Sequence, residues 1–153
     1  MSELALVNDR LGNFFIATGL MQHLMADGGA LPLDEKQLRS IRGYTCNVDI
    51  FSFYQVFIPT NIRNFHWMMI VIKIQLKEIR CYDSMSGPGT VYTDKVKDWL
   101  VKEMASKKKE VLNISEWKVL TQEKFVPQQG SNPNECGLFT MMCADFLSDY
   151  LPM

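Results

Sequence analysis

Apolar residues recur at two different spacings along the chain, and the spacing separates the expected helices from the expected strands. Near the N-terminus they stand three or four positions apart over residues 10–25, which predicts an amphipathic helix. Asn8 or Asp9 can cap this helix, and the Asp-Gly-Gly sequence at 27–29 is expected to end it. A second, short helix is predicted over residues 33–41. The positions that carry the first pattern are Leu11, Phe14, Phe15, Thr18, Leu20, Met21, Leu24 and Met25.

The middle of the chain changes to runs of aromatic and β-branched residues, which are typical of strands. One strand is expected over residues 51–59, followed by a turn at 61–64 and a second strand over 68–76. Lys77 and Glu78 are predicted to form a tight turn, from which a third strand returns over 79–82. The last two strands should therefore form an antiparallel hairpin.

The C-terminal half returns to helical spacing. A helix is predicted over residues 91–105, a short strand over 117–120, and a last helix that ends near Tyr150. We expect the apolar face of the last helix to pack into the core. That face comprises Leu138, Phe139, Met141, Met142, Ala144, Phe146 and Leu147. The order of elements predicts one α+β domain over residues 1–153.

Composition excludes several classes of protein. Of 153 residues, 47% are hydrophobic and 22% are charged, which is ordinary for a folded domain and argues against disorder. The net charge of −1 gives no field that would attract nucleic acid or acidic lipid. The sequence contains no apolar stretch long enough for a membrane span and no secretory signal at its start. Composition and charge therefore argue against a disordered chain, a nucleic-acid-binding protein and a membrane-spanning protein.

The four cysteines, Cys46, Cys81, Cys136 and Cys143, do not form a metal-binding pattern. No Cys-x-x-Cys pair is present and the chain has only 2 histidines, so neither a zinc site nor another metal site is expected. Without a secretory signal the thiols should be reduced. Cys143 stands two helical turns after Cys136 and is expected to point into the core.

Residues 125–139, FVPQQGSNPNECGLF, have the features of a segment that presents a nucleophile. Gly, Ser, Asn and Pro allow an unusual turn, and Cys136 follows this turn at the start of the last helix. The positive end of a helix dipole favours the thiolate of a cysteine in that position. Gly137 has no Cβ, so a substrate carbonyl could approach the main chain closely.

The predicted hairpin supplies a base for this nucleophile. His66 begins the outgoing strand and Asp83 ends the returning one. Because the strands are joined by a tight turn at their other ends, His66 and Asp83 should be neighbours although they are 83 − 66 = 17 positions apart. A histidine oriented by a carboxylate is the base half of a catalytic triad.

Two runs of this sequence resemble a known family. They are FIPTNIRNFHWMMIVIKIQLKEIRCYDSMSG, residues 57–87, and VPQQGSNPNECGLFTMMCADFLSDYL, residues 126–151. With His, Asp, Gln and Cys in this order, the chain resembles the catalytic domain of the Ulp1/SENP cysteine proteases. The resemblance implies a papain-like fold of the adenain/Ulp1 type, with a mixed central sheet flanked by helices.

The resemblance also implies a role for each matching position. Cys136 would be the nucleophile, His66 the general base and acid, and Asp83 the group that orients the imidazole. Gln129, or Gln128 in an alternative register, would form the oxyanion hole with the backbone N–H of Cys136. The register stays open because residues 130–135 are one longer than is usual in the family, and Glu135 replaces the usual Asp.

Substrate contacts follow from the same resemblance. Trp67 would line a narrow channel for a Gly-Gly tail, with Gly137 beside the nucleophile. Leu6 stands where the family has a tryptophan that forms the opposite wall, so the channel is looser on that side or the alignment differs there.

The resemblance implies thiol proteolysis after the C-terminal Gly-Gly of a ubiquitin-like modifier, without a cofactor. It also suggests a monomer in the nucleus or the cytoplasm. SUMO is the first candidate for this modifier, and NEDD8 or ubiquitin are the alternatives. Two further hypotheses are an acetyltransferase built on the same residues and a modifier-binding module with an impaired site. A basic pocket for an acyl-CoA, which the transferase would need, is not evident in the sequence.

Overall fold

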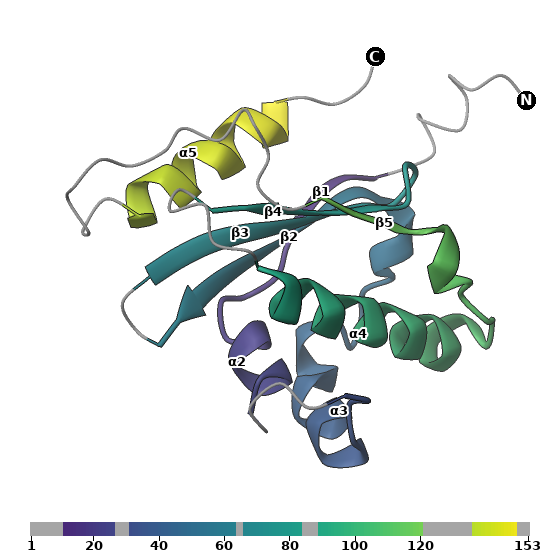
Figure 1. The fold of residues 1–153 in the computed structure, drawn as a ribbon. Helices are drawn as coiled ribbons and strands as arrows, with labels where there is room; N and C mark the ends of the chain where they lie inside the picture. Colours follow the sequence, from purple (N-terminus) through teal and green to yellow (C-terminus); the bar gives the residue numbers. More distant parts are fainter. Residues whose placement is uncertain (1–10, 27–30, 64–65, 84–88, 121–135, 150–153) are drawn as a thin grey trace, which may run out of the picture.

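A five-stranded sheet forms the centre of the protein in a computed structural model, which describes residues 11–26, 31–63, 66–83, 89–120 and 136–149 (Figure 1). The strands lie in the order β1-β2-β3-β4-β5. Their bounds are β1 Leu11–Phe15, β2 Phe53–Ile62, β3 His66–Lys73, β4 Glu78–Tyr82 and β5 Lys118–Leu120. The α-helices are α2 Leu20–Leu24, α3 Glu35–Ile41, α4 Thr90–Lys108 and α5 Cys136–Asp149. Short 3₁₀ helices are η1 Arg42–Tyr44, η2 Ile50–Ser52 and η3 Ile114–Glu116.

The sheet is mixed. Strands β2, β3 and β4 are antiparallel to one another, whereas β1 pairs with β2 and β5 pairs with β4 in parallel. Of the helices in the described ranges, α2, α3 and α4 cover one face of the sheet and α5 covers the other (Figure 1). The predicted fold, an α+β protein with a mixed sheet flanked by helices, is confirmed.

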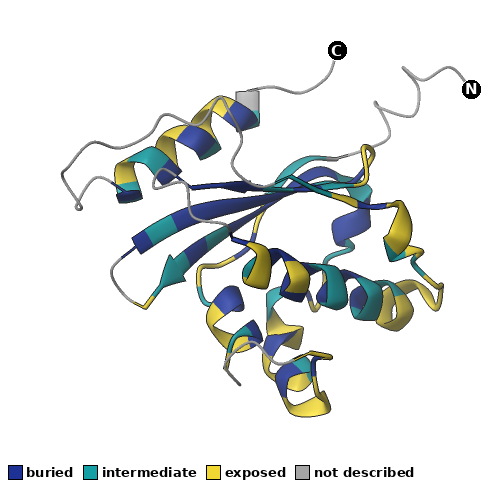
Figure 2. Ribbon diagram, in the orientation of Figure 1, coloured by how far each residue is buried: buried dark blue, intermediate teal, exposed yellow. Residues whose placement is uncertain are grey.

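Two cores of unequal size lie on the two faces of the sheet. The larger core fills the space between the sheet and α2, α3 and α4 and includes the fully buried Trp99 and Leu100 of α4. The smaller core lies under α5. Its members are Phe57, Met69, Val71, Tyr82, Cys143 and Leu147. The central strands are buried on both faces, as Figure 2 shows, because alternate side chains of each strand enter different cores.

The predicted helix over residues 10–25 is wrong in its first half. Residues Leu11–Phe15 form strand β1, and only Leu20–Leu24 are helical. Strand β1 is held by its parallel pairing with β2 and by two ring contacts, Phe14 with Phe53 and Phe15 with Phe57. Aromatic residues at neighbouring positions are compatible with the two faces of a strand as well as with one face of a helix. Here the pairing with β2 makes these residues a strand. The predicted caps at Asn8, Asp9 and 27–29 lie outside the described residues.

The predicted hairpin is confirmed, with its turn shifted by a few residues. Strand β3 ends at Lys73, and residues 74–77 form the turn, which the Lys77 amide closes by donating to the Ile74 carbonyl at 3.2 Å. Glu78, predicted to lie in the turn, is the first residue of β4 and pairs with Lys73. Strand β2 also extends to Ile62, beyond the predicted end at residue 59.

The three later helices are confirmed, with different ends. Asp34 caps α3 in a capping box with Gln37, in which each side chain accepts from the other residue's backbone N–H. Helix α4 begins at Thr90 after Gly89, whose φ of 61° lies in the left-handed region that glycine adopts without strain.

Strand β5 begins at Lys118, one residue after the predicted start. In the part of the chain that the structure describes, no helix is both long and apolar enough to cross a bilayer.

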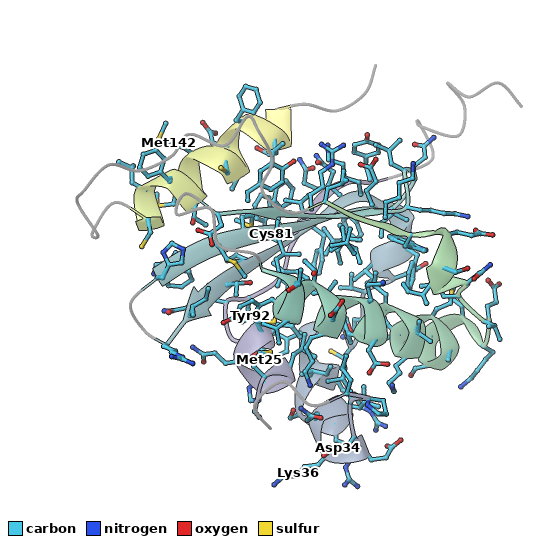
Figure 3. All side chains as sticks on the ribbon, in the orientation of Figure 1. Met25, Asp34, Lys36, Cys81, Tyr92 and Met142 are labelled. Carbon is cyan, nitrogen blue, oxygen red and sulfur yellow. The ribbon has the colours of Figure 1, made fainter. Side chains whose placement is uncertain are left out.

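Helix α5 is confirmed, but the prediction that its whole apolar face enters the core is wrong. The side towards the sheet is formed by Cys136, Thr140, Cys143 and Leu147, each less than 10% exposed. Leu138, Met141, Met142 and Phe146 are 58%, 69%, 51% and 62% exposed. Figure 3 labels Met142 on the side of α5 turned away from the sheet. A helix that packs on a sheet with one stripe leaves its other stripe outside, whatever the polarity of its residues.

A buried carboxylate joins α4 to the segment after η1. Glu103 is 9% exposed and accepts a hydrogen bond from Thr45 Oγ1 at 2.8 Å, with Lys107 Nζ at 4.0 Å. Burial raises the pKa of Glu103 above its usual value, although Thr45 and Lys107 oppose the shift. The stability linked to this proton is present below the unfolded-state pKa and is lost as the pH rises through the folded-state pKa.

We predict that Glu103→Gln, which resembles the protonated acid, gains stability relative to the unchanged protein as the pH rises from 4 to 7. The measurement is the free energy of unfolding in urea at several pH values. Glu116→Gln is the control, because hydrogen bonding to Lys77 lowers the pKa of the exposed Glu116. The difference in unfolding free energy between Glu116→Gln and the unchanged protein should therefore change with pH in the opposite direction. A difference for Glu103→Gln that does not vary with pH would contradict the assignment.

Candidate active site

His66 and Asp83 form a buried pair at the end of the β3–β4 hairpin. His66 Nε2 lies 2.7 Å from Asp83 Oδ1, and the two residues are only 6% and 5% exposed. The hairpin register pairs Met69 with Tyr82, so the residues beyond these positions, His66 and Asp83, emerge at the same end of the sheet. The predicted proximity of His66 and Asp83 is confirmed.

The second nitrogen of the imidazole is available for proton transfer. With Nε2–H donating to Asp83, His66 Nδ1 carries the lone pair. His66 Nδ1 is buried and has no hydrogen-bond partner within the described parts of the chain. A histidine held by a carboxylate at one nitrogen and open at the other is arranged to accept a proton from a thiol or a water.

Cys136 is brought to this pair by the first turn of α5. It is the first residue of the helix and is 4% exposed. Its Sγ accepts a hydrogen bond from the backbone N–H of Trp67 at 3.4 Å, across 136 − 67 = 69 positions of sequence. Because Trp67 directly follows His66, this contact places the sulfur beside the residue next to the candidate base.

The Trp67 amide can serve Cys136 because of where the sheet pairing stops. Strand β4 pairs with β3 only as far as Met69, whereas β2 continues to pair with β3 up to His66. Among the described residues, none therefore pairs with Trp67 on the β4 side of β3, and the Trp67 N–H donates to the sulfur. A hydrogen bond from a fixed backbone amide holds the sulfur at a defined position, because hydrogen bonds depend steeply on distance and angle. This contact could not be predicted from residue types, because any residue at position 67 other than proline would supply the same N–H.

Trp67 also lies beside Gly137. A Cβ added at Gly137 would stand 3.7 Å from Trp67 Cδ1, which is an ordinary van der Waals contact. The indole of Trp67 and Gly137 are therefore within van der Waals range of each other. Since an added Cβ would fit the protein itself, the glycine is not required by the internal packing here, and its small size leaves room next to the indole.

The other three cysteines differ from Cys136 in their surroundings. Burial, followed by the charge of Asp83, raises the pKa of Cys81 to about 12. Burial also raises the pKa of Cys143. Cys46 is exposed, and none of the four cysteines forms a disulfide. Cys81 lies between the sheet and α4, where Figure 3 labels it, with its Sγ 3.6 Å from Met68 Sδ. Neither Cys81 nor Cys143 has surroundings that favour a thiolate.

Three predicted site residues cannot be placed. Leu6, Gln128 and Gln129 lie outside the described residues, so the oxyanion donor and the second channel wall stay predictions. No cluster of three or more His, Cys, Asp or Glu side chains suited to a metal ion occurs among the residues that are described.

The comparisons with known proteins bear on the same residues. The sequence profile described as the Ulp1 protease family, C-terminal catalytic domain, matches residues 32–153. A sentrin-specific protease of Caenorhabditis elegans is 33% identical over 113 residues, which cover 74% of this chain and 16% of the relative. The chain thus spans less than a fifth of the length of this relative.

Solved structures show the same fold. A de-sumoylating protease superposes with a TM-score of 0.76 at 21% identity, over 94% of this chain and 54% of that one. The C-terminal Ulp1 protease domain in complex with Smt3, the yeast orthologue of SUMO, superposes with a TM-score of 0.66 at 20% identity. This match covers 97% of the present chain and 63% of the solved one. The match to the family profile includes both the His66–Asp83 hairpin and the helix of Cys136, and the chain therefore belongs to the Ulp1 protease family.

Proposed function

We propose that this chain is a cysteine protease that cleaves the bond after the C-terminal Gly-Gly of a ubiquitin-like modifier, with SUMO as the first candidate. One observation carries the proposal: the Cys136 sulfur is held on the Trp67 amide, next to a buried His66–Asp83 pair with a free Nδ1. Membership of the family and the complex of a relative with Smt3 support the choice of modifier.

The first half of the reaction forms a thioester. His66 Nδ1 accepts the proton of the Cys136 thiol, and the sulfur attacks the carbonyl carbon that follows the second glycine. The negative charge that develops on the carbonyl oxygen is held by the backbone N–H of Cys136 and the side chain of Gln129, or of Gln128. His66 then gives its proton to the departing amine, and the C–N bond breaks.

The second half releases the modifier. A water molecule gives a proton to His66 Nδ1 and attacks the thioester carbonyl. The C–S bond breaks, the modifier leaves with a free carboxylate, and Cys136 recovers its proton from His66. Asp83 stays ionised throughout and stabilises the imidazolium that forms twice in each cycle.

Selectivity for Gly-Gly comes from the surroundings of the nucleophile. The Trp67 indole on one side and Leu6 on the other would form a channel too narrow for side chains, with Gly137 leaving space at its end. NEDD8 and ubiquitin are the alternative modifiers, since the Gly-Gly tail does not distinguish among the three. A binding module with an impaired site is the non-enzymatic alternative.

The variant series that tests this function uses precursors of SUMO, NEDD8 and ubiquitin with a short C-terminal extension. We expect the SUMO precursor to be cleaved fastest and Cys136→Ala to abolish cleavage. Asp83→Ala should lower kcat by roughly 10²–10⁴, because the imidazole loses its orientation and its counter-charge. Cleavage by Cys136→Ala would exclude the proposed nucleophile. SUMO binding without cleavage of any precursor would favour the binding module.

The same assay distinguishes whether Gln129 or Gln128 is the oxyanion donor. Loss of an oxyanion donor costs about 10²–10³ in kcat, and we expect this loss in Gln129→Ala. Gln128→Ala is the matched control at the neighbouring position. If Gln128→Ala loses activity and Gln129→Ala does not, the oxyanion donor is Gln128 and our register is wrong by one residue.

Alkylation tests the nucleophile without any modifier. In a Cys46→Ser background, iodoacetamide at pH 8 should modify Cys136 first, as followed by peptide mass spectrometry. Cys81, with a pKa of about 12, should have roughly one thiolate in 10⁴ molecules at this pH and stay unmodified in the folded protein. Modification of Cys81 at a rate similar to Cys136 would contradict the difference between their environments.

A further inference from the structure

Two amide side chains join the far end of α5 to the sheet. Gln55 Nε2 donates to the Leu147 carbonyl at 3.0 Å and to Asn13 Oδ1 at 3.0 Å. Asn13 Nδ2 in turn donates to the Ser148 carbonyl at 3.0 Å. Asn13 and Gln55 are direct partners in the pairing of β1 with β2, so one site on the sheet holds two successive carbonyls of the helix. We call these two residues the amide clamp.

The clamp uses atoms that a helix end leaves unpaired. The last four carbonyls of an α-helix have no partner within the helix, and those of Leu147 and Ser148 belong to the last turn of α5. Gln55 is fully buried, and its Oε1 has no hydrogen-bond partner among the described residues. An unpaired buried oxygen is unfavourable, so an apolar side chain would suit position 55 better if only packing mattered. What Gln55 contributes is its pair of N–H donors.

The other contacts between α5 and the sheet do little to fix the position of the helix along its own axis. The buried stripe of the helix consists of Cys136, Thr140, Cys143 and Leu147, which lie over a small apolar core. Apolar contacts of this kind are non-directional, and the opposite stripe of the helix is exposed. Hydrogen bonds depend steeply on distance and angle. Among the contacts described above, the directional ones occur at the two ends of α5, at Cys136 and at the clamp.

We propose that Asn13 and Gln55 are positioning residues that fix the axial position of α5 and thereby hold the Cys136 sulfur on the Trp67 amide beside His66. The clamp lies 147 − 136 = 11 residues along the helix, or about 16 Å, from the nucleophile. Figure 1 shows α5 running along the sheet with its first turn near the start of β3 and its last turn near β1. A helix transmits an axial displacement with little change, so a shift at Leu147 is a shift at Cys136.

The inference rests on the proposed function only in taking Cys136 as the reactive thiol. A displacement of about 1 Å at a reacting atom can cost on the order of 10² in rate, which makes the axial position of α5 functionally important. The clamp residues do not touch the substrate or the reacting atoms. Their effect should therefore appear in kcat and in the reactivity of the sulfur, and not in binding of the modifier.

The test compares two buried glutamines with the same chemistry. Gln55→Leu removes the donor at α5. Gln37→Leu is the matched control, because Gln37 is 5% exposed and donates through Nε2 to the Leu24 carbonyl at the end of α2, on the other face of the sheet. Both substitutions remove a buried donor to a carbonyl at a helix end, and only the first touches α5. Gln37→Leu also removes the Oε1 that accepts from the Asp34 N–H in the capping box of α3.

Two readouts are measured in the Cys46→Ser background: the rate of Cys136 alkylation by iodoacetamide as a function of pH, and kcat and KM on a modifier precursor. For Gln55→Leu we expect kcat to fall roughly 10- to 100-fold with KM within about twofold, together with a displaced pH profile of alkylation. For Gln37→Leu we expect an unchanged profile and kcat, even if thermal stability falls. The alkylation readout needs no modifier, so it decides the role of the clamp even if none of the precursors is cleaved.

Asn13→Asp is the second variant, for the case in which Gln55→Leu does not fold. Aspartate can still accept from Gln55, but it sets a carboxylate oxygen in place of the donor to the Ser148 carbonyl and repels it, so we expect a change of the same kind. An unchanged alkylation profile and kcat in Gln55→Leu, or in Asn13→Asp if Gln55→Leu is unfolded, would overturn the proposal. Equal losses in Gln55→Leu and Gln37→Leu would overturn it too, because the effect would then be one of general stability.

Discussion

The pairing of β3 with β4 is the interaction on which the candidate site depends. It places His66 and Asp83 at one end of the hairpin and buries both, so that their hydrogen bond forms away from water. It also stops at Met69, which leaves the Trp67 amide to the sulfur of Cys136. If β4 paired with β3 for two more residues, the space beside Trp67 would be filled by a strand and no thiol could reach it. The length of this ladder therefore determines both where the His66–Asp83 pair lies and where the Cys136 sulfur is bound.

The two faces of the sheet contribute differently to the site. The face under α2, α3 and α4 carries the larger core, which includes Trp99. The face under α5 carries a small core and a helix whose outer stripe is exposed. His66 and Asp83 thus lie at one end of the sheet, whereas Cys136 lies on a helix that packs on the sheet separately. Such an arrangement requires directional contacts to position the helix, and hydrogen bonds at both ends of α5 supply them.

The sequence was sufficient where chain connectivity alone fixes the geometry. A tight turn near Lys77 must bring His66 close to Asp83 whatever the rest of the fold does, and the shifted turn did not affect this result. Periodicity failed for residues 11–15, because Phe14 and Phe15 satisfy the helical spacing but pair with β2 in the folded protein. It also failed for Met141 and Met142, since a pattern shows that a stripe is apolar and not whether anything covers it. Contacts through main-chain atoms, such as the Trp67 amide on Cys136, leave no trace in residue identities.

The central claim, that Cys136 is the nucleophile of a protease for a ubiquitin-like modifier, is tested most directly by covalent capture. The protein is mixed in turn with SUMO, NEDD8 and ubiquitin, each carrying a thiol-reactive group in place of its terminal carboxylate, and the intact mass is measured. The account predicts a single adduct with SUMO that is absent in Cys136→Ser. No adduct with any of the three modifiers, or an adduct that persists in Cys136→Ser, would contradict it.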